Sequence, residues 1–227
     1  MQWSELAAPW QTCWQEAWEA CRVGCVPVGA VILDENGREI SRGRNRIGVD
    51  APPGQIGHSD LAHAEMNALI QVDRTRINTH TCILYTLLEP CPLCMGAIYM
   101  VGVRTVAYAA RDAFAGSINL LGATPYYSRK KIRVIAPFSP AVEAAVVALN
   151  TARHLAAGFS PVKYADLYTA WEGSSPNGYR VGVALYENGR LAGSPPKETI
   201  RCIPGSQASL QNGWVCQSRR AKRYPGK

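Results

Sequence analysis

Hydrophobic positions along the first 157 residues follow two repeats. Apolar side chains recur at steps of three and four over residues 5–22 and 139–157, which predicts two amphipathic helices. Short apolar or β-branched runs predict strands, and the Asn-Gly pair after the first run is a hairpin signal. The expected strands are residues 26–33, 38–46, 83–88, 104–110 and the end of 126–135.

Two further helices are expected next to histidine, glutamate and cysteine side chains that can bind a metal or carry a proton. Residues 61–70 favour a helix, with Ser59 or Asp60 as its N-cap. A second helix is expected over residues 93–100, because Pro92 suits a first helical turn. The first of these helices carries an H-x-E motif and the second follows a P-C-x-x-C motif.

His63, Cys91 and Cys94 are candidate zinc ligands. One neutral imidazole and two thiolates bind zinc well and leave a fourth tetrahedral position for water. Zinc lowers the pKa of such a water to roughly 7. Glu65 is two residues from His63 and is poorly placed to be a fourth ligand, so we expect it to move protons between water and the leaving nitrogen.

Each motif alone also has an ordinary explanation. A single C-x-x-C can be a redox pair, and a single H-x-E can occur by accident in a polar helix. Both motifs occur in order, about 25 residues apart, and each lies on the expected element. This combination favours a metal centre.

The charge distribution and the lengths of the apolar runs indicate what the protein can bind and where it acts. The net charge is +7, but residues 1–172 carry 15 basic and 15 acidic residues, so the excess lies in residues 173–227. Residues 1–172 therefore have no excess positive charge for binding a nucleic acid, although a local basic patch is compatible with this count. The chain has no apolar run of about 18–20 residues and no secretory signal at its start, which predicts a cytoplasmic protein without a membrane segment.

The remaining cysteines are expected to be free thiols in a reducing cytosol. Four of them lie in apolar segments and are predicted to be buried: Cys13, Cys21, Cys25 and Cys82. Cys202 and Cys216 either pair or stay free, and free thiols are favoured.

The composition changes towards the C-terminus. Gly, Pro and Ser make up 19 of the last 55 residues. One hairpin is expected over residues 179–191, around Asn188-Gly189, and residues 219–223 form a basic cluster. We expect a domain over residues 1–157 and a partly disordered, basic extension over residues 158–227. The alternative is an appendage that holds RNA or DNA.

Two loops are candidates for substrate contact. Asn45 ends the second expected strand, where it either faces the site or caps a turn. Phe114 lies in a Gly-containing segment after the fourth strand and either stacks on a base or fills the core. His58, in the loop before the zinc helix, is expected to be solvated; His80 and His154 are expected to be structural.

The motifs resemble those of the cytidine-deaminase-like superfamily, which has the signature H-x-E and P-C-x-x-C. The residues that carry the resemblance are Pro27–Val31, Asn45, His63–Glu65 and Glu89–Ala97, within residues 5–155. The chain is most similar to the branch of bacterial nucleoside, guanine and tRNA adenosine deaminases. No lysine occurs in residues 111–117, where the tRNA enzymes usually have one.

This resemblance implies a three-layer α/β/α sandwich with a five-stranded mixed sheet, usually assembled as a homodimer. It implies that His63, Cys91 and Cys94 bind Zn²⁺, that Glu65 shuttles protons, and that Asn45 and the Ala64 main chain contact the substrate. We expect hydrolytic deamination of a nucleobase or nucleoside, with RNA or single-stranded DNA less favoured. The alternatives are tRNA adenosine deamination and, in a different class, a zinc-stabilised binding domain without catalysis.

Overall fold

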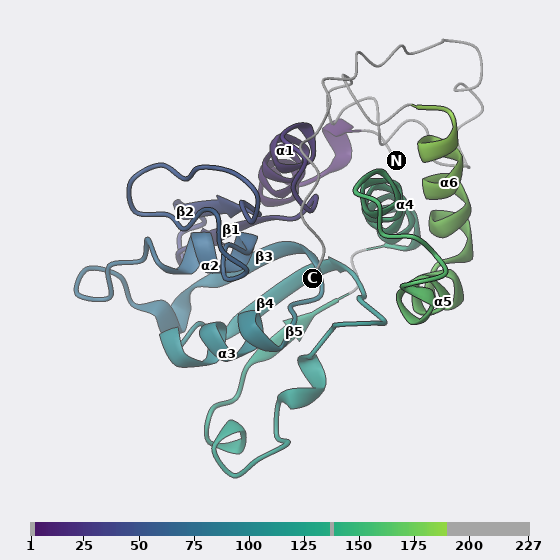
Figure 1. Cartoon of the computed structure of the whole chain (residues 1–227). Coiled ribbons are helices and arrows are strands. Elements are labelled where there is room, and N and C mark those ends of the chain that lie inside the picture. Colours follow the sequence, from purple (N-terminus) through teal and green to yellow (C-terminus); the bar gives the residue numbers. More distant parts are fainter. Residues whose placement is uncertain (1–2, 137–138, 190–227) are drawn as a thin grey trace.

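A five-stranded mixed sheet organises the chain, in the order β2-β1-β3-β4-β5. The computed structural model describes residues 3–136 and 139–189 (Figure 1). Strand β1 is antiparallel to both β2 and β3, whereas β3, β4 and β5 are parallel. The strands are β1 (Gly29–Leu33), β2 (Glu39–Arg44), β3 (Ile83–Leu88), β4 (Thr105–Ala110) and β5 (Arg133–Ile135).

Helices cover both faces of this sheet and give three layers (Figure 1). One face packs against α1 (Ala8–Arg22) and α4 (Pro140–Ala156), and the other against α2 (Ala64–Leu69) and α3 (Pro92–Val101). Neighbouring residues of β3 point to opposite faces, as the pleat requires: the Tyr85 ring packs on Trp10 of α1, whereas the Thr86 hydroxyl meets α2. The predicted three-layer α/β/α sandwich is confirmed.

The apolar stripe predicted for the first helix is the buried face of α1, which contributes Trp10, Cys13, Trp14, Ala17 and Cys21 to the core. Short 3-10 helices complete the described elements: η1 (Trp3–Glu5), η2 (Thr79–Thr81), η3 (Ile118–Leu120) and η4 (Tyr127–Arg129). The four cysteines predicted to be buried free thiols are buried and free; Cys202 and Cys216 lie outside the described residues.

The start of the zinc helix differs from the prediction. His63, in an extended conformation, is the N-cap of α2, and the prediction of Ser59 or Asp60 was wrong. The reason is a tertiary contact, because the Arg46 N–H donates to the Ala62 carbonyl at 2.8 Å. This bond ties residue 62 to the end of β2, so the helix begins only after residue 63.

The hairpin predicted over residues 179–191 was also wrong. The chain instead forms α5 (Ala165–Ser174) and α6 (Pro176–Glu187), and residues 190–191 lie outside the described part. Pro176 starts α6, and Asn188-Gly189 ends it, with Gly189 at φ +63°. A left-handed glycine after a helix is a common C-terminal signal, so the same dipeptide that suits a hairpin suits this helix end.

Helix α6 packs against α4 on the side away from the sheet (Figure 1). Residues 165–187 are therefore helical and packed within the stretch that was expected to be a partly disordered extension. The boundary expected after residue 157 falls at the end of α4. Within residues 3–136 and 139–189, no helix combines the length and apolar character needed to cross a membrane.

Candidate metal centre

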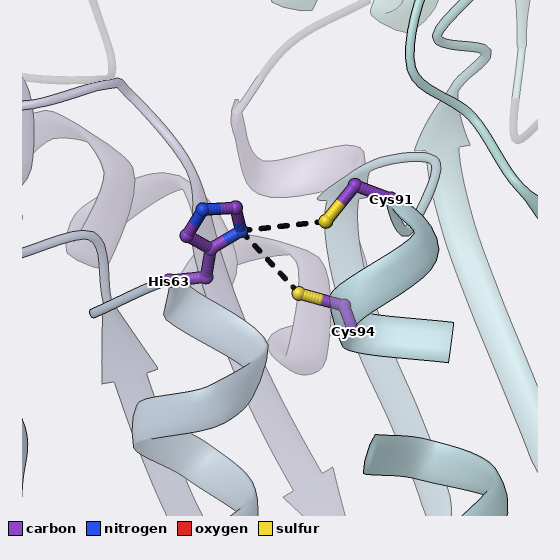
Figure 2. A group of neighbouring side chains, drawn as sticks. All are labelled: His63, Cys91 and Cys94. Atoms are coloured by element: carbon purple, nitrogen blue, oxygen red, sulfur yellow. Dashed lines mark hydrogen bonds between the residues drawn. The ribbon is translucent and has the colours of Figure 1, made fainter. Parts of the chain in front are cut away.

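Two helix N-termini bring the three predicted ligands together. His63 precedes α2, Cys91 precedes α3, and Cys94 lies in the first turn of α3. Figure 2 shows His63 Nδ1 facing the sulfur atoms of Cys91 and Cys94. Both nitrogen–sulfur distances are 3.5 Å. The three ligand atoms all lie within 4.8 Å of one another.

These distances fit a tetrahedral zinc ion. With Zn–S of about 2.3 Å and Zn–N of about 2.0 Å, a tetrahedral angle separates nitrogen from sulfur by about 3.5 Å. One imidazole nitrogen and two sulfurs also match the softness of zinc. The His63, Cys91 and Cys94 side chains would therefore hold the ion, and the zinc assignment made from the sequence is supported by this geometry.

The electrostatics of the cluster favour one thiolate. A hydrogen bond from the Cys94 thiol, assisted by His63, lowers the pKa of Cys91 to about 4. The same bond and burial raise the pKa of Cys94. The hydrogen bond with Cys91 raises the pKa of His63. The cluster thus holds negative charge on sulfur, which is the form that a metal binds.

Glu65 lies inside the fold, next to the ligand cluster. Its side chain is only 4% exposed, and its Oε1 accepts a hydrogen bond of 2.9 Å from the Thr86 hydroxyl. Its Oε2 lies 3.3 Å from the Cys94 sulfur. Burial raises the pKa of Glu65, which suits a group that must take up and release a proton.

The candidate substrate contacts occupy three different environments. Asn45 follows β2, is 4% exposed, and accepts a hydrogen bond of 3.2 Å from the Ile47 N–H. Ala64 is the buried first residue of α2. Phe114 is 56% exposed, so it is not a core plug. A contact of these three residues with a substrate stays a prediction.

The other histidines lie apart from the ligand cluster. The His58 side chain is 61% exposed and pairs with Asp50 at 3.0 Å. His80 is exposed. His154 lies near the end of α4, where its ring packs on Phe159 and Trp171. The surroundings of His58 and His154 agree with the solvated and structural roles expected for them.

Three polar residues of the site region escaped the sequence analysis. Thr86 holds Glu65, and the fully buried Asn67 side chain bonds both main-chain groups of Ile56, which fixes the loop before α2. Glu89 accepts hydrogen bonds from the loop after β4. The sequence signal that could have identified them is a single polar residue beside or within an apolar run. A polar group buried there requires a hydrogen-bond partner.

Comparison with known proteins adds to this geometry. Residues 4–110 match the sequence model of the cytidine and deoxycytidylate deaminase zinc-binding region. The three ligands, Glu65, Ala64 and Asn45 all fall inside the match. Residues 4–110 are thus similar to this deaminase family. Phe114 and the helices α4, α5 and α6 lie beyond the matched family region.

Several curated relatives are similar to this deaminase region. Guanine deaminase of Bacillus subtilis is 38% identical over 91 residues, which cover 39% of this chain and 53% of the relative. A tRNA-specific adenosine deaminase of Aquifex aeolicus is 36% identical over 107 residues, or 46% and 65% of the two chains. A probable cytosine deaminase of Schizosaccharomyces pombe is 37% identical over 82 residues, or 36% and 46%. The chain thus spans between 46% and 65% of the length of these relatives.

A solved structure supports the fold of the deaminase region. It comes from a study of A-to-I editing by tRNA:A34 deaminases at the wobble position of transfer RNA. The two structures agree with a TM-score of 0.51 at 24% identity, over 61% of this chain and 97% of the other. This likeness concerns the fold alone.

Proposed function

We propose that the protein is a zinc-dependent hydrolytic deaminase of an amino-bearing nucleobase or nucleoside, with ammonia as a product. The observation that carries this proposal is the buried carboxylate of Glu65 beside a three-ligand cluster. A purely structural zinc site is usually closed by a fourth protein ligand and has no use for a proton carrier. This argues against the zinc-stabilised binding domain as the main function.

The reaction converts a ring carbon bearing an amino group to a carbonyl and consumes one water molecule. A bound zinc ion supplies the nucleophile by making water acidic at neutral pH. Glu65 takes one proton of the attacking water and passes it to the ring nitrogen, and then carries the second proton of that water to the departing amine as the carbonyl forms. Thr86 holds the Glu65 carboxylate in place through Oε1.

In this proposal the catalytic domain covers residues 1–157 and acts in the cytoplasm as a homodimer. Asn45 and the Ala64 main chain contact the substrate, and Phe114 stacks on the base. A stacked base contributes about 1–3 kcal/mol of binding, so the exposed Phe114 ring is suited to such a contact. Sedimentation of the zinc-loaded protein tests the dimer.

The experiment is ammonia release from guanine, cytosine, adenine, their nucleosides and an anticodon stem-loop RNA. Glu65→Gln is the matched control, because it keeps the size of the side chain but cannot carry the proton. We expect it to retain zinc and lose roughly 10²–10⁴-fold in rate. A fully active Glu65→Gln variant would exclude this mechanism, and a zinc-loaded protein inactive on every compound would favour the binding domain.

Adenosine deamination in tRNA is the second candidate. A local basic surface favours it, although the overall charge of residues 1–172 is balanced. Lys130 lies over the Tyr99 ring at 4.3 Å. Burial lowers the pKa of Lys130, and the neighbouring cations Arg104, Arg74 and Arg129 lower it further. Ammonia release from the stem-loop RNA alone would place this candidate first.

A further inference from the structure

The loop that carries Phe114 is anchored on the residues just before the zinc ligand Cys91. We call residues 111–118 the Phe114 loop. The Glu89 carboxylate accepts hydrogen bonds from both ends of the loop, at 3.4 Å from the Asp112 N–H and 3.3 Å from the Ile118 N–H. The Pro90 carbonyl accepts one from the Ser117 N–H at 3.0 Å. A shift of this loop therefore changes the position of Phe114 relative to the metal centre.

Asp112 fixes the turn of the loop. Its Oδ1 accepts hydrogen bonds of 3.0 Å from the main-chain N–H groups of Phe114 and Ala115. Its carbonyl oxygen accepts a third from the Gly116 N–H at 2.8 Å. The space is tight, because a side chain at Gly116 would lie within about 2.5 Å of the Asp112 carbonyl and the Glu89 carboxyl.

The same Oδ1 atom of Asp112 has a partner far away in the sequence. The Trp171 indole Nε1 of α5 donates to it at 3.4 Å. Trp171 is 3% exposed, and its ring is held edge-on against His154 of α4 at 5.0 Å and Tyr168 of α5 at 6.2 Å. Contacts with α4 and α5 therefore hold the indole in place, and its N–H points to the Phe114 loop.

We propose that Trp171 is a positioning residue, which acts through Asp112 to hold Phe114 where it can stack on the base. Trp171 itself does not touch the substrate. The assignment gives a role in the reaction to α5, which lies outside the matched family region of residues 4–110. It rests on the proposed function for the substrate, but its loop contact can be tested without any substrate.

The test compares Trp171→Phe with Tyr168→Phe in the zinc-loaded full chain. Trp171→Phe keeps an aromatic ring and removes the donor to Asp112 together with part of the buried indole. Tyr168→Phe is the matched control, since it removes an equivalent donor on α5 that bonds the Phe159 carbonyl at 2.6 Å, not the loop. Zinc content and Tm, measured for both variants, identify any variant that fails to fold.

The first readout is amide hydrogen exchange of peptides that cover residues 111–118. We expect Trp171→Phe to speed exchange roughly threefold to tenfold, the range of one ordinary hydrogen bond, and Tyr168→Phe to leave it unchanged. Equal exchange in Trp171→Phe and the wild type would overturn the proposal. This outcome is independent of any activity, so it separates failure of the positioning role from failure of the deaminase proposal.

The second readout is kinetics on the compound deaminated fastest by the wild type. A loss of stacking raises KM, so we expect KM to rise roughly threefold to tenfold in Trp171→Phe with kcat within about twofold. Asp112→Ala should raise KM at least as much, and adding Trp171→Phe to it should have no further effect. Additive effects of the two substitutions would overturn the proposal. If no compound is deaminated, hydrogen exchange alone decides it.

Discussion

The zinc-site region and the C-terminal helices are both closely packed, but with different kinds of residue. Around the metal ligands several buried side chains are polar, and Glu65, Asn67 and Thr86 each have a hydrogen-bond partner. Between α4 and α6 the contact is made by small residues, with Gly178 and Gly182 against Ala144 and Ala148. The first region depends on hydrogen-bond and ligand chemistry, and the second on shape.

The difference predicts how each region responds to substitution. Removing a partner in the polar region leaves a buried polar group unsatisfied, so activity and metal binding change first. Adding a methyl group in the small-residue contact forces helices apart, so stability changes first. The following substitutions separate these two behaviours.

Cys94→Ala is expected to have the largest effect. Loss of one of three ligands should weaken zinc binding by more than about a hundredfold, because even residues that only orient a ligand contribute about 10–100-fold. Metal analysis should fall from about one zinc per chain to near none, and ammonia release should be lost. Cys82→Ala is the control, since Cys82 is also buried but lies outside the cluster; a zinc-free Cys82→Ala protein would contradict the assignment.

Thr86→Val tests the polar region without touching a ligand. Valine has nearly the same shape but cannot donate to Glu65 Oε1, so the buried carboxylate loses its partner. This costs about 1–3 kcal/mol, which predicts a rate about tenfold or more below the wild type. Zinc content should stay the same. A Thr86→Val enzyme with wild-type kcat would show that Thr86 does not hold the carboxylate during the reaction.

Gly182→Ala tests the small-residue contact between α6 and α4. A Cβ atom at this position would lie 2.6 Å from both the Ala148 carbonyl oxygen and the Thr151 Cβ. We expect a loss of about 1–3 kcal/mol in the free energy of unfolding, measured by urea denaturation, with zinc content unchanged.

Gly173→Ala on α5 is the matched control for this substitution. No atom lies within 4 Å of a Cβ at Gly173. Alanine in a helix is favoured over glycine by about 0.5–1 kcal/mol, so this variant should be as stable as the wild type or slightly more stable. If both variants are destabilised equally, the close contact at Gly182 is not the cause.

The two regions also differ in how far the sequence predicts them. Strand β3 begins and ends at the predicted residues 83–88, because an apolar run bounded by a proline leaves few alternatives. The structure brings the three candidate ligands together, and the sequence could single them out because zinc accepts few residue types at few spacings. Thr86 was missed, since its partner Glu65 is 21 residues away and only the folded sheet brings them together.

The C-terminal helices could not be predicted from local signals. Taken alone, glycine, proline and the Asn188-Gly189 pair predict turns, so the sequence predicted a hairpin over residues 179–191. In the structure Pro176 starts α6, Gly178 and Gly182 permit its close approach to α4, and Gly189 ends it. Each of these residues has a role that depends on a neighbour distant in the sequence, so tertiary packing decides the helix.

His154, on α4, gives the smallest expected effect. Burial lowers the pKa of His154, with the Arg153 charge adding to it, while the Asn150 carbonyl and Asp112 act in the opposite direction. Since a carbonyl only accepts, His154 Nδ1 donates the hydrogen bond of 2.8 Å to Asn150. The neutral ring lies between Phe159 and Trp171.

A lowered pKa in the folded state means that the unfolded chain binds the proton first. The contribution of His154 to stability is therefore complete above its ordinary pKa of about 6.5 and is lost as the pH falls below that value. We expect the difference in Tm between the wild type and His154→Phe to shift in favour of the variant as the pH drops from about 7.5 to 5.5. Loss of zinc through His63 affects both proteins equally and cancels in this difference. A constant difference in Tm over this range would mean that the His154 ring takes up its proton as readily in the folded protein as in the unfolded chain.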